Sequence, residues 1–106
     1  MQTSTETVPT RFHPRVEAGF MVKLLLNGKA TVAKADDLSM AGLRLLGEFS
    51  HQHTEVKVAI PLPGDREIVT DAVVKRFDPD AMAIEFKQLD WDDMFALARF
   101  LHPRLP

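Results

Sequence analysis

Apolar and polar residues alternate along most of this chain, and no other feature of the sequence constrains its fold as strongly. Successive side chains of a strand point to opposite faces, so alternation predicts strands that turn one face toward a core. The pattern recurs in six separate stretches of the sequence. We therefore predict strands over residues 16–26, 29–35, 42–46, 56–62, 66–77 and 82–86.

Turn-forming residues separate the predicted strands. Asn27-Gly28 is typical of a two-residue hairpin, because both residues tolerate positive φ. The stretch PLPGD at 61–65 and the triplet DPD at 78–80 are also turn signals. We expect residues 36–42 to form a loop or a bulge. The predicted strands therefore follow one another through short connections, as antiparallel neighbours do.

The end of the chain changes to the spacing of an amphipathic helix. Asp90 can cap the N-terminus of this helix, and Asp92 and Asp93 suit its positive end. Pro103 ends the helix. The apolar residues at helical spacing are Trp91, Met94, Phe95, Leu97, Ala98 and Leu101. We expect the stripe formed by residues 94, 97, 98 and 101 to belong to the core.

Six short strands in a chain of 106 residues leave exposed strand edges, which invite aggregation. Closure into a barrel removes these edges, and the helix can cover one opening. We therefore predict an all-β fold, a six-stranded antiparallel β-barrel of split or Greek-key-like form with a C-terminal α-helix. Residues 1–10 are predicted to be a flexible tail, and residues 11–106 a single domain.

Composition and charge exclude several classes of function. The sequence has 13 Lys and Arg against 15 Asp and Glu, and this net charge of −2 disfavours a general nucleic-acid binder. It has no cysteine, which excludes disulfides, thiolate zinc sites and cysteine nucleophiles. It has no apolar run near the ~20 residues of a membrane helix and no apolar stretch typical of a signal peptide. We expect a cytoplasmic protein without membrane insertion.

Two short motifs contain the residues best suited to ligand chemistry. Arg11 and Arg15 form R-x-x-x-R ahead of the first strand, and arginine binds phosphates bidentately and stacks on flat rings. Asp37, Ser39 and Gly42 form D-x-S-x-x-G after the second strand. A carboxylate can accept two N–H bonds from a guanine edge, and glycine lets a backbone approach closely. Each motif alone is typical of an ordinary surface or turn.

In this order and at this spacing, the motifs RFHPR and DLSMAG resemble those of the PilZ domain family, whose members bind the bacterial second messenger cyclic di-GMP. The likeness extends to GLRLL after the second motif, to AIEF at 83–86 and to the closing helix. It covers roughly residues 10–102 and implies a stand-alone receptor, with motility or biofilm regulation among its outputs and with no catalysis and no cofactor. Some members of the family lack the arginine motif and act purely as protein adaptors, which is the main alternative.

The resemblance also implies which residues bind the ligand. Arg11 and Arg15 match the pair that clasps phosphates and guanine faces, and Asp37 matches the position that reads a guanine edge. Ser39 and Gly42 match the positions of a polar contact and of a tight backbone. We expect the N-terminal arm to close over the ligand and thereby to expose or hide a surface for a protein partner.

Other kinds of function have weaker support in the sequence. It contains no G-x-S-x-G, no H-E-x-x-H and no glycine-rich phosphate loop, which disfavours an enzyme. A barrel for single-stranded nucleic acid needs aromatic residues among basic ones, and the sequence has no Tyr and one Trp. His51 and His53 could begin a metal site with His13 or His102, but no acidic residue lies at a recognisable spacing. We expect these histidines at the surface and no metal.

Overall fold

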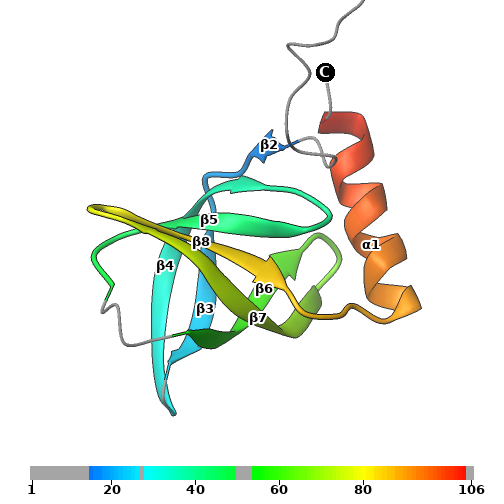
Figure 1. The fold of residues 1–106 in the computed structure, drawn as a ribbon. Helices are drawn as coiled ribbons and strands as arrows, with labels where there is room; N and C mark the ends of the chain where they lie inside the picture. Colours follow the sequence, from blue (N-terminus) through cyan, green and yellow to red (C-terminus); the bar gives the residue numbers. More distant parts are fainter. Residues whose placement is uncertain (1–14, 27, 50–53, 105–106) are drawn as a thin grey trace, which may run out of the picture.

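The computed structural model describes residues 15–26, 28–49 and 54–104, which form a β-barrel and a helix (Figure 1). The predicted tail, Arg11 and Asn27 lie outside the described residues. Along the chain the elements are β2 (Val16–Glu17), β3 (Met21–Leu26), β4 (Lys29–Leu38), β5 (Gly42–Leu46), β6 (Glu55–Leu62), β7 (Arg66–Asp78), β8 (Ala81–Phe86), α1 (Trp91–Leu101) and the 3₁₀ turn η1 (His102–Arg104).

Six of the described strands form a closed antiparallel barrel. The strand order is β4-β3-β6-β7-β8-β5, and pairing between β4 and β5 closes the ring. The seventh strand, β2, pairs with β4 beyond the end of β3. The structure thus confirms the predicted six-stranded antiparallel barrel with a C-terminal helix. Closure gives each of the six strands a partner on both sides, so the barrel leaves no exposed strand edge among these six strands, as expected.

The first predicted strand is broken in the structure. Residues 16–26 were expected to be continuous, but β2 and β3 are separated by a kink at Gly19, which has a φ of 79°. The amides of Ala18 and Gly19 donate to the carbonyls of Asp36 (3.0 Å) and Ala35 (2.8 Å). The backbone therefore stays attached to β4 through the kink, and Val16 is still buried.

The second predicted strand is longer than expected. It was predicted to end at Ala35 and to be followed by a loop or a bulge over 36–42. Instead, β4 continues to Leu38, and the bulge lies within the strand. The register between β4 and β5 shifts between Ala35 and Asp37, which makes Asp36 the extra residue of a β-bulge. Ala35 and Leu38 face the core, while the two aspartates between them are both partly exposed.

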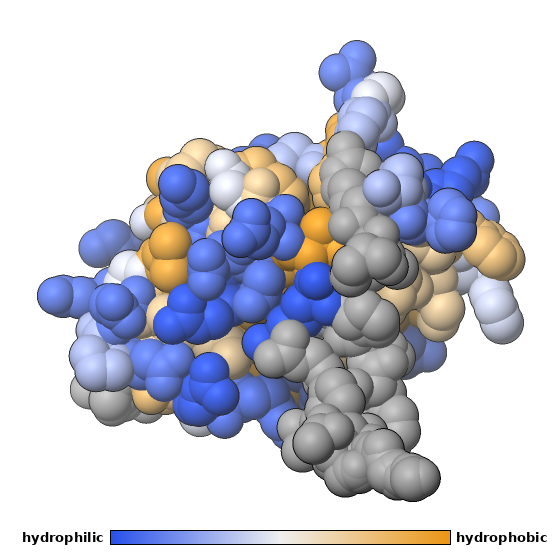
Figure 2. Space-filling view, turned by 90° about the horizontal axis from the view of Figure 1, so that it is seen from above, coloured by the Kyte–Doolittle hydropathy of each residue, from blue (hydrophilic) through white to orange (hydrophobic). Residues whose placement is uncertain are grey.

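Inward-facing side chains from the strands and one face of the helix fill the core. The largest fully buried side chains are Leu38, Leu45, Ile60, Ile68, Met82, Leu97, Val22 and Val58. The helix α1 lies at one end of the barrel (Figure 1). The ring of Phe100 meets that of Phe20 edge-on at 6.1 Å, which joins the helix to the β2–β3 kink. The face seen in Figure 2 is, apart from its grey atoms, largely hydrophilic with small separate hydrophobic areas.

The helix begins and packs partly as predicted. The side chain of Asp90 accepts a hydrogen bond from the amide of Asp93 at 2.8 Å, which confirms the cap. Leu97 and Leu101 are buried, but Ala98 is exposed, so its assignment to the core was wrong. With 11 residues, α1 is too short to span a bilayer, and no other helix in the described part of the chain could do so.

A second apolar stripe on α1 faces outward. Trp91 is 71% exposed and Phe95 57%, and their rings contact each other at 6.0 Å. Both residues follow the helical spacing, yet the barrel covers the neighbouring stripe instead. The helix therefore has two adjacent apolar stripes, of which the barrel covers the one that contains Leu97 and Leu101.

Leu97→Ala is expected to lower the free energy of unfolding by about 2–5 kcal/mol, because it leaves a cavity in the core. Phe95→Ala removes a side chain that is 57% exposed, and we expect a change within about 0.5 kcal/mol. Denaturant unfolding of both variants measures the difference. Equal losses would mean that α1 packs by another face.

Candidate functional site

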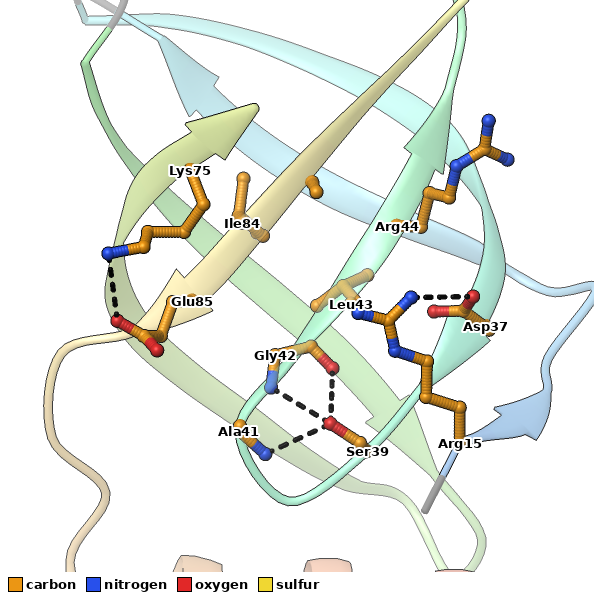
Figure 3. Close-up of a pocket in the computed structure, with 11 residues that line it drawn as sticks. Arg15, Asp37, Ser39, Ala41, Gly42, Leu43, Arg44, Lys75, Ile84 and Glu85 are labelled. Atoms are coloured by element: carbon orange, nitrogen blue, oxygen red, sulfur yellow. Dashed lines mark hydrogen bonds and ion pairs between the residues drawn. The ribbon is translucent and has the colours of Figure 1, made fainter. Parts of the chain in front are cut away.

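A small hollow lies on the outer surface of the barrel, where β4, β5, β7 and β8 are neighbours (Figure 3). Gly42 pairs with Glu85 across β5 and β8, and Arg44 pairs with Ala83. Because Gly42 has no side chain and Ala83 has only a methyl group, the surface stays low here between longer side chains. The hollow has a volume of about 120 Å³.

One side of the hollow is formed by an ion pair that joins the two motifs. The Nη1 atom of Arg15 lies 3.5 Å from Oδ2 of Asp37, and the two side chains are 37% and 22% exposed. The contact follows from the short ladder between β2 and β4, in which Glu17 lies opposite Asp37. The structure therefore brings Arg15 to the second motif, whereas Arg11 lies outside the described residues.

The neighbouring aspartate has a different arginine as its partner. The Nη1 atom of Arg44 donates to Oδ2 of Asp36 at 2.7 Å, and its Nη2 atom lies 3.6 Å from Oδ2 of Asp78. The hydrogen bond to Asp36 and the surrounding negative charges raise the pKa of Arg44 above its ordinary value. This arginine lines the hollow, but its charge is already balanced by two carboxylates that tie the β4 bulge to β5 and β7.

Ser39 and Gly42 shape the turn beside the hollow. The Ser39 hydroxyl accepts hydrogen bonds from the amides of Ala41 (3.1 Å) and Gly42 (3.3 Å). The Ser39 amide donates to the Gly42 carbonyl at 2.9 Å, and the residue is only 5% exposed. A Cβ at Gly42 would collide with the carbonyl oxygen of Ile84. Both residues thus hold the backbone that carries the site, and their expected contacts with a ligand stay a prediction.

A second ion pair lies on the other side of the hollow. The Nζ atom of Lys75 is 3.6 Å from Oε1 of Glu85, and both side chains are about half exposed. Neither residue was predicted from the sequence to belong to the site. Lys75 lies where the register of β7 against β8 shifts, between Val74 and Arg76. A bulge depends on the partner strand, so the local sequence contains no signal for it.

The expected surface histidines lie mostly outside the described residues. His13, His51 and His53 are among the residues that are not described, and His102 is exposed at the start of η1. Within residues 15–26, 28–49 and 54–104, no group of three or more His, Cys, Asp or Glu side chains could hold a metal ion.

The closed barrel, its terminal helix and a polar hollow flanked by ion pairs define a small β-barrel domain with a candidate ligand site. The model of the PilZ domain family matches residues 9–102. The chain therefore belongs to the PilZ domain family, as its motifs indicated. No curated protein sequence matches it.

Several solved structures share the fold, among them these three. The Bacillus subtilis inhibitor of motility MotI/DgrA has a TM-score of 0.78 and 24% identity, with 92% of this chain and 52% of that one covered. The K. pneumonia MrkH–c-di-GMP complex has a TM-score of 0.70 and 18% identity, with 91% and 52% covered. The PilZ domain of CeSA from a cellulose-synthesizing bacterium has a TM-score of 0.67 and 17% identity, with 84% and 95% covered. The chain thus spans about half the length of MotI/DgrA and MrkH.

Gly42→Ala is expected to lower the free energy of unfolding by about 1–3 kcal/mol, because the new methyl group pushes β5 away from β8. Hydrogen exchange of the Phe86 amide, which donates to the Ala41 carbonyl at 2.8 Å, measures the local pairing and is expected to accelerate. The control is Gly64→Ala, where φ is 78° but nothing lies near the added carbon. It should destabilise through backbone strain without a selective effect on Phe86.

Proposed function

We propose that this chain is a receptor domain for cyclic di-GMP. The ligand lies over the hollow, held by Arg11, Arg15 and Asp37, with Ser39 and Gly42 fixing the turn beside it. The observation that carries the proposal is the contact of Arg15 with Asp37, which joins the two motifs at the edge of the hollow. Membership of the PilZ domain family and the likeness to MrkH, solved as a complex with c-di-GMP, support it.

The chemistry of the two side chains suits the two parts of such a ligand. A guanidinium can bind a phosphate bidentately or meet the acceptors N7 and O6 of guanine. A carboxylate can accept the N1–H and N2–H bonds of the same base. The Arg15–Asp37 pair is partly exposed, and exposed pairs contribute only about 0–1 kcal/mol. Breaking this contact therefore costs little free energy, and both side chains can turn from each other to the ligand.

The size of the hollow supports a role for the N-terminal arm in binding. Its volume of about 120 Å³ is well below the roughly 300–1,000 Å³ of pockets that enclose a small molecule. The barrel covers only part of the ligand, and we assign the remaining cover to the arm of residues 1–15. Closure of this arm would then expose or hide a surface for a protein partner. The likeness to the motility inhibitor MotI/DgrA makes motility a candidate output.

An adaptor that binds a protein and no nucleotide is the second candidate. It is favoured by Trp91 and Phe95, whose exposed rings lie together on α1. Aromatic residues of this kind are enriched at protein interfaces. Neither candidate involves catalysis.

Titration calorimetry with cyclic di-GMP tests the receptor. Arg15→Ala is expected to lose about 1.5–3 kcal/mol of binding free energy, or about 10- to 150-fold in affinity. We expect a loss in the same range for Asp37→Ala. Cyclic di-AMP and GTP serve as competing ligands that should bind poorly. The measured stoichiometry also distinguishes one bound ligand from a stacked pair.

Lys23→Ala is the matched control, since Lys23 forms an ion pair with Glu67 at 3.0 Å that does not line the hollow. This variant should bind like the wild type. If the wild type bound no cyclic di-GMP, the receptor assignment would be wrong. If the wild type bound it but the Arg15 and Asp37 variants both bound as tightly, the assignment of the site to these residues would be wrong. The first of these results would favour the adaptor.

A further inference from the structure

The hollow is flanked by a cation and a carboxylate on each of two opposite sides. Arg15 and Asp37 form one pair at 3.5 Å, and Lys75 and Glu85 form the other at 3.6 Å. Figure 3 shows the two pairs on either side of the turn that contains Gly42. The second pair belongs to neither motif, so its position calls for a separate explanation.

A β-bulge in each of two strands produces this arrangement. Strict alternation along β7 would turn one of two successive residues inward, but Lys75 and Arg76 are both exposed because Lys75 is the extra residue. The bulge in β4 likewise leaves Asp36 and Asp37 both partly exposed.

At each bulge, one of the two charged residues does not line the hollow and is bound to another side chain. Asp36 is bound to Arg44 at 2.7 Å, and Arg76 to Asp78 at 3.2 Å. The other residue, Asp37 in β4 and Lys75 in β7, lines the hollow.

The Lys75–Glu85 pair contributes little to the stability of the barrel. Its side chains are 58% and 51% exposed, and ion pairs of this kind contribute about 0–1 kcal/mol because water screens them. Both groups can therefore turn to a ligand without a large loss. Lys57 and Asp71 form a similar exposed pair at 2.9 Å that does not line the hollow, which makes them a matched control.

We propose that Lys75 and Glu85 form a second half-site for the same ligand, an inference that rests on the proposed receptor function. Cyclic di-GMP repeats its chemistry, with two guanines and two phosphates. Asp37 reads one guanine, and the Glu85 carboxylate accepts the N1–H and N2–H bonds of the other. The Lys75 ammonium contacts a phosphate as a point charge. Adenine presents an acceptor at N1, so a carboxylate at this position selects guanine.

The test compares cyclic di-GMP with the mixed dinucleotide cyclic GMP-AMP by titration calorimetry. For the wild type, the mixed ligand should bind more weakly, since its adenine meets Glu85. Glu85→Gln should weaken cyclic di-GMP by about 10-fold and reduce the preference over the mixed ligand by a similar factor, because an amide can pair with either base. Lys75→Ala should weaken both ligands equally and leave the preference unchanged.

Controls keep this inference separate from the receptor proposal. Asp71→Asn and Lys57→Ala should leave both affinities unchanged, and thermal unfolding should show every variant folded. If Arg15→Ala loses affinity while Glu85→Gln and Lys75→Ala bind like the wild type, the second half-site is wrong and the receptor stands. An unchanged preference in Glu85→Gln also refutes it. If the wild type binds no cyclic di-GMP, both proposals fail together.

Discussion

The pairing of β5 with both of its neighbours closes the barrel, and the candidate site depends on this closure. β5 reaches β8 at its first residue only because Gly42 carries no side chain that would meet the Ile84 carbonyl. The turn that brings β5 to this point is held by the Ser39 hydroxyl. The same close approach leaves the surface low and thereby forms the hollow. One close backbone contact thus links the closure of the barrel, the second motif and the hollow.

The charged residues around the hollow differ in how firmly their partners hold them. Arg44 contacts two carboxylates and connects three strands, so its charge helps to hold the barrel together. Arg15 and Lys75 each pair with a single, partly exposed carboxylate. Weak pairs of this kind keep four ionic groups in place, yet can exchange their partners readily. The strands fix the positions of these groups, and the weak pairing allows the groups to change partners.

Much of the fold could be predicted from the sequence, because alternation reports directly which face of a strand is buried. A bulge was one of two alternatives predicted over 36–42, and Asp36 confirms it. The bulge at Lys75 was not predicted, because its extra residue exists only relative to a partner strand. On the helix, the predicted core stripe was right for Leu97 and Leu101 and wrong for Ala98, which lies at the edge of that stripe. For the site, the motif resemblance predicted that Arg15 and Asp37 act together. No local pattern connects Lys75 with Glu85.

The bulge in β4 also makes the number of residues in this strand part of the site. Asp36 and Asp37 are both available at the surface because β4 holds one residue more than β5 opposes. A deletion of one residue here would restore regular alternation and keep Ala35 and Leu38 in the core. It would leave a single carboxylate, for which Arg15 and Arg44 would then compete. Relatives with one residue fewer at this point would keep the barrel. They would no longer have one carboxylate bound to Arg44 and a second one that lines the hollow.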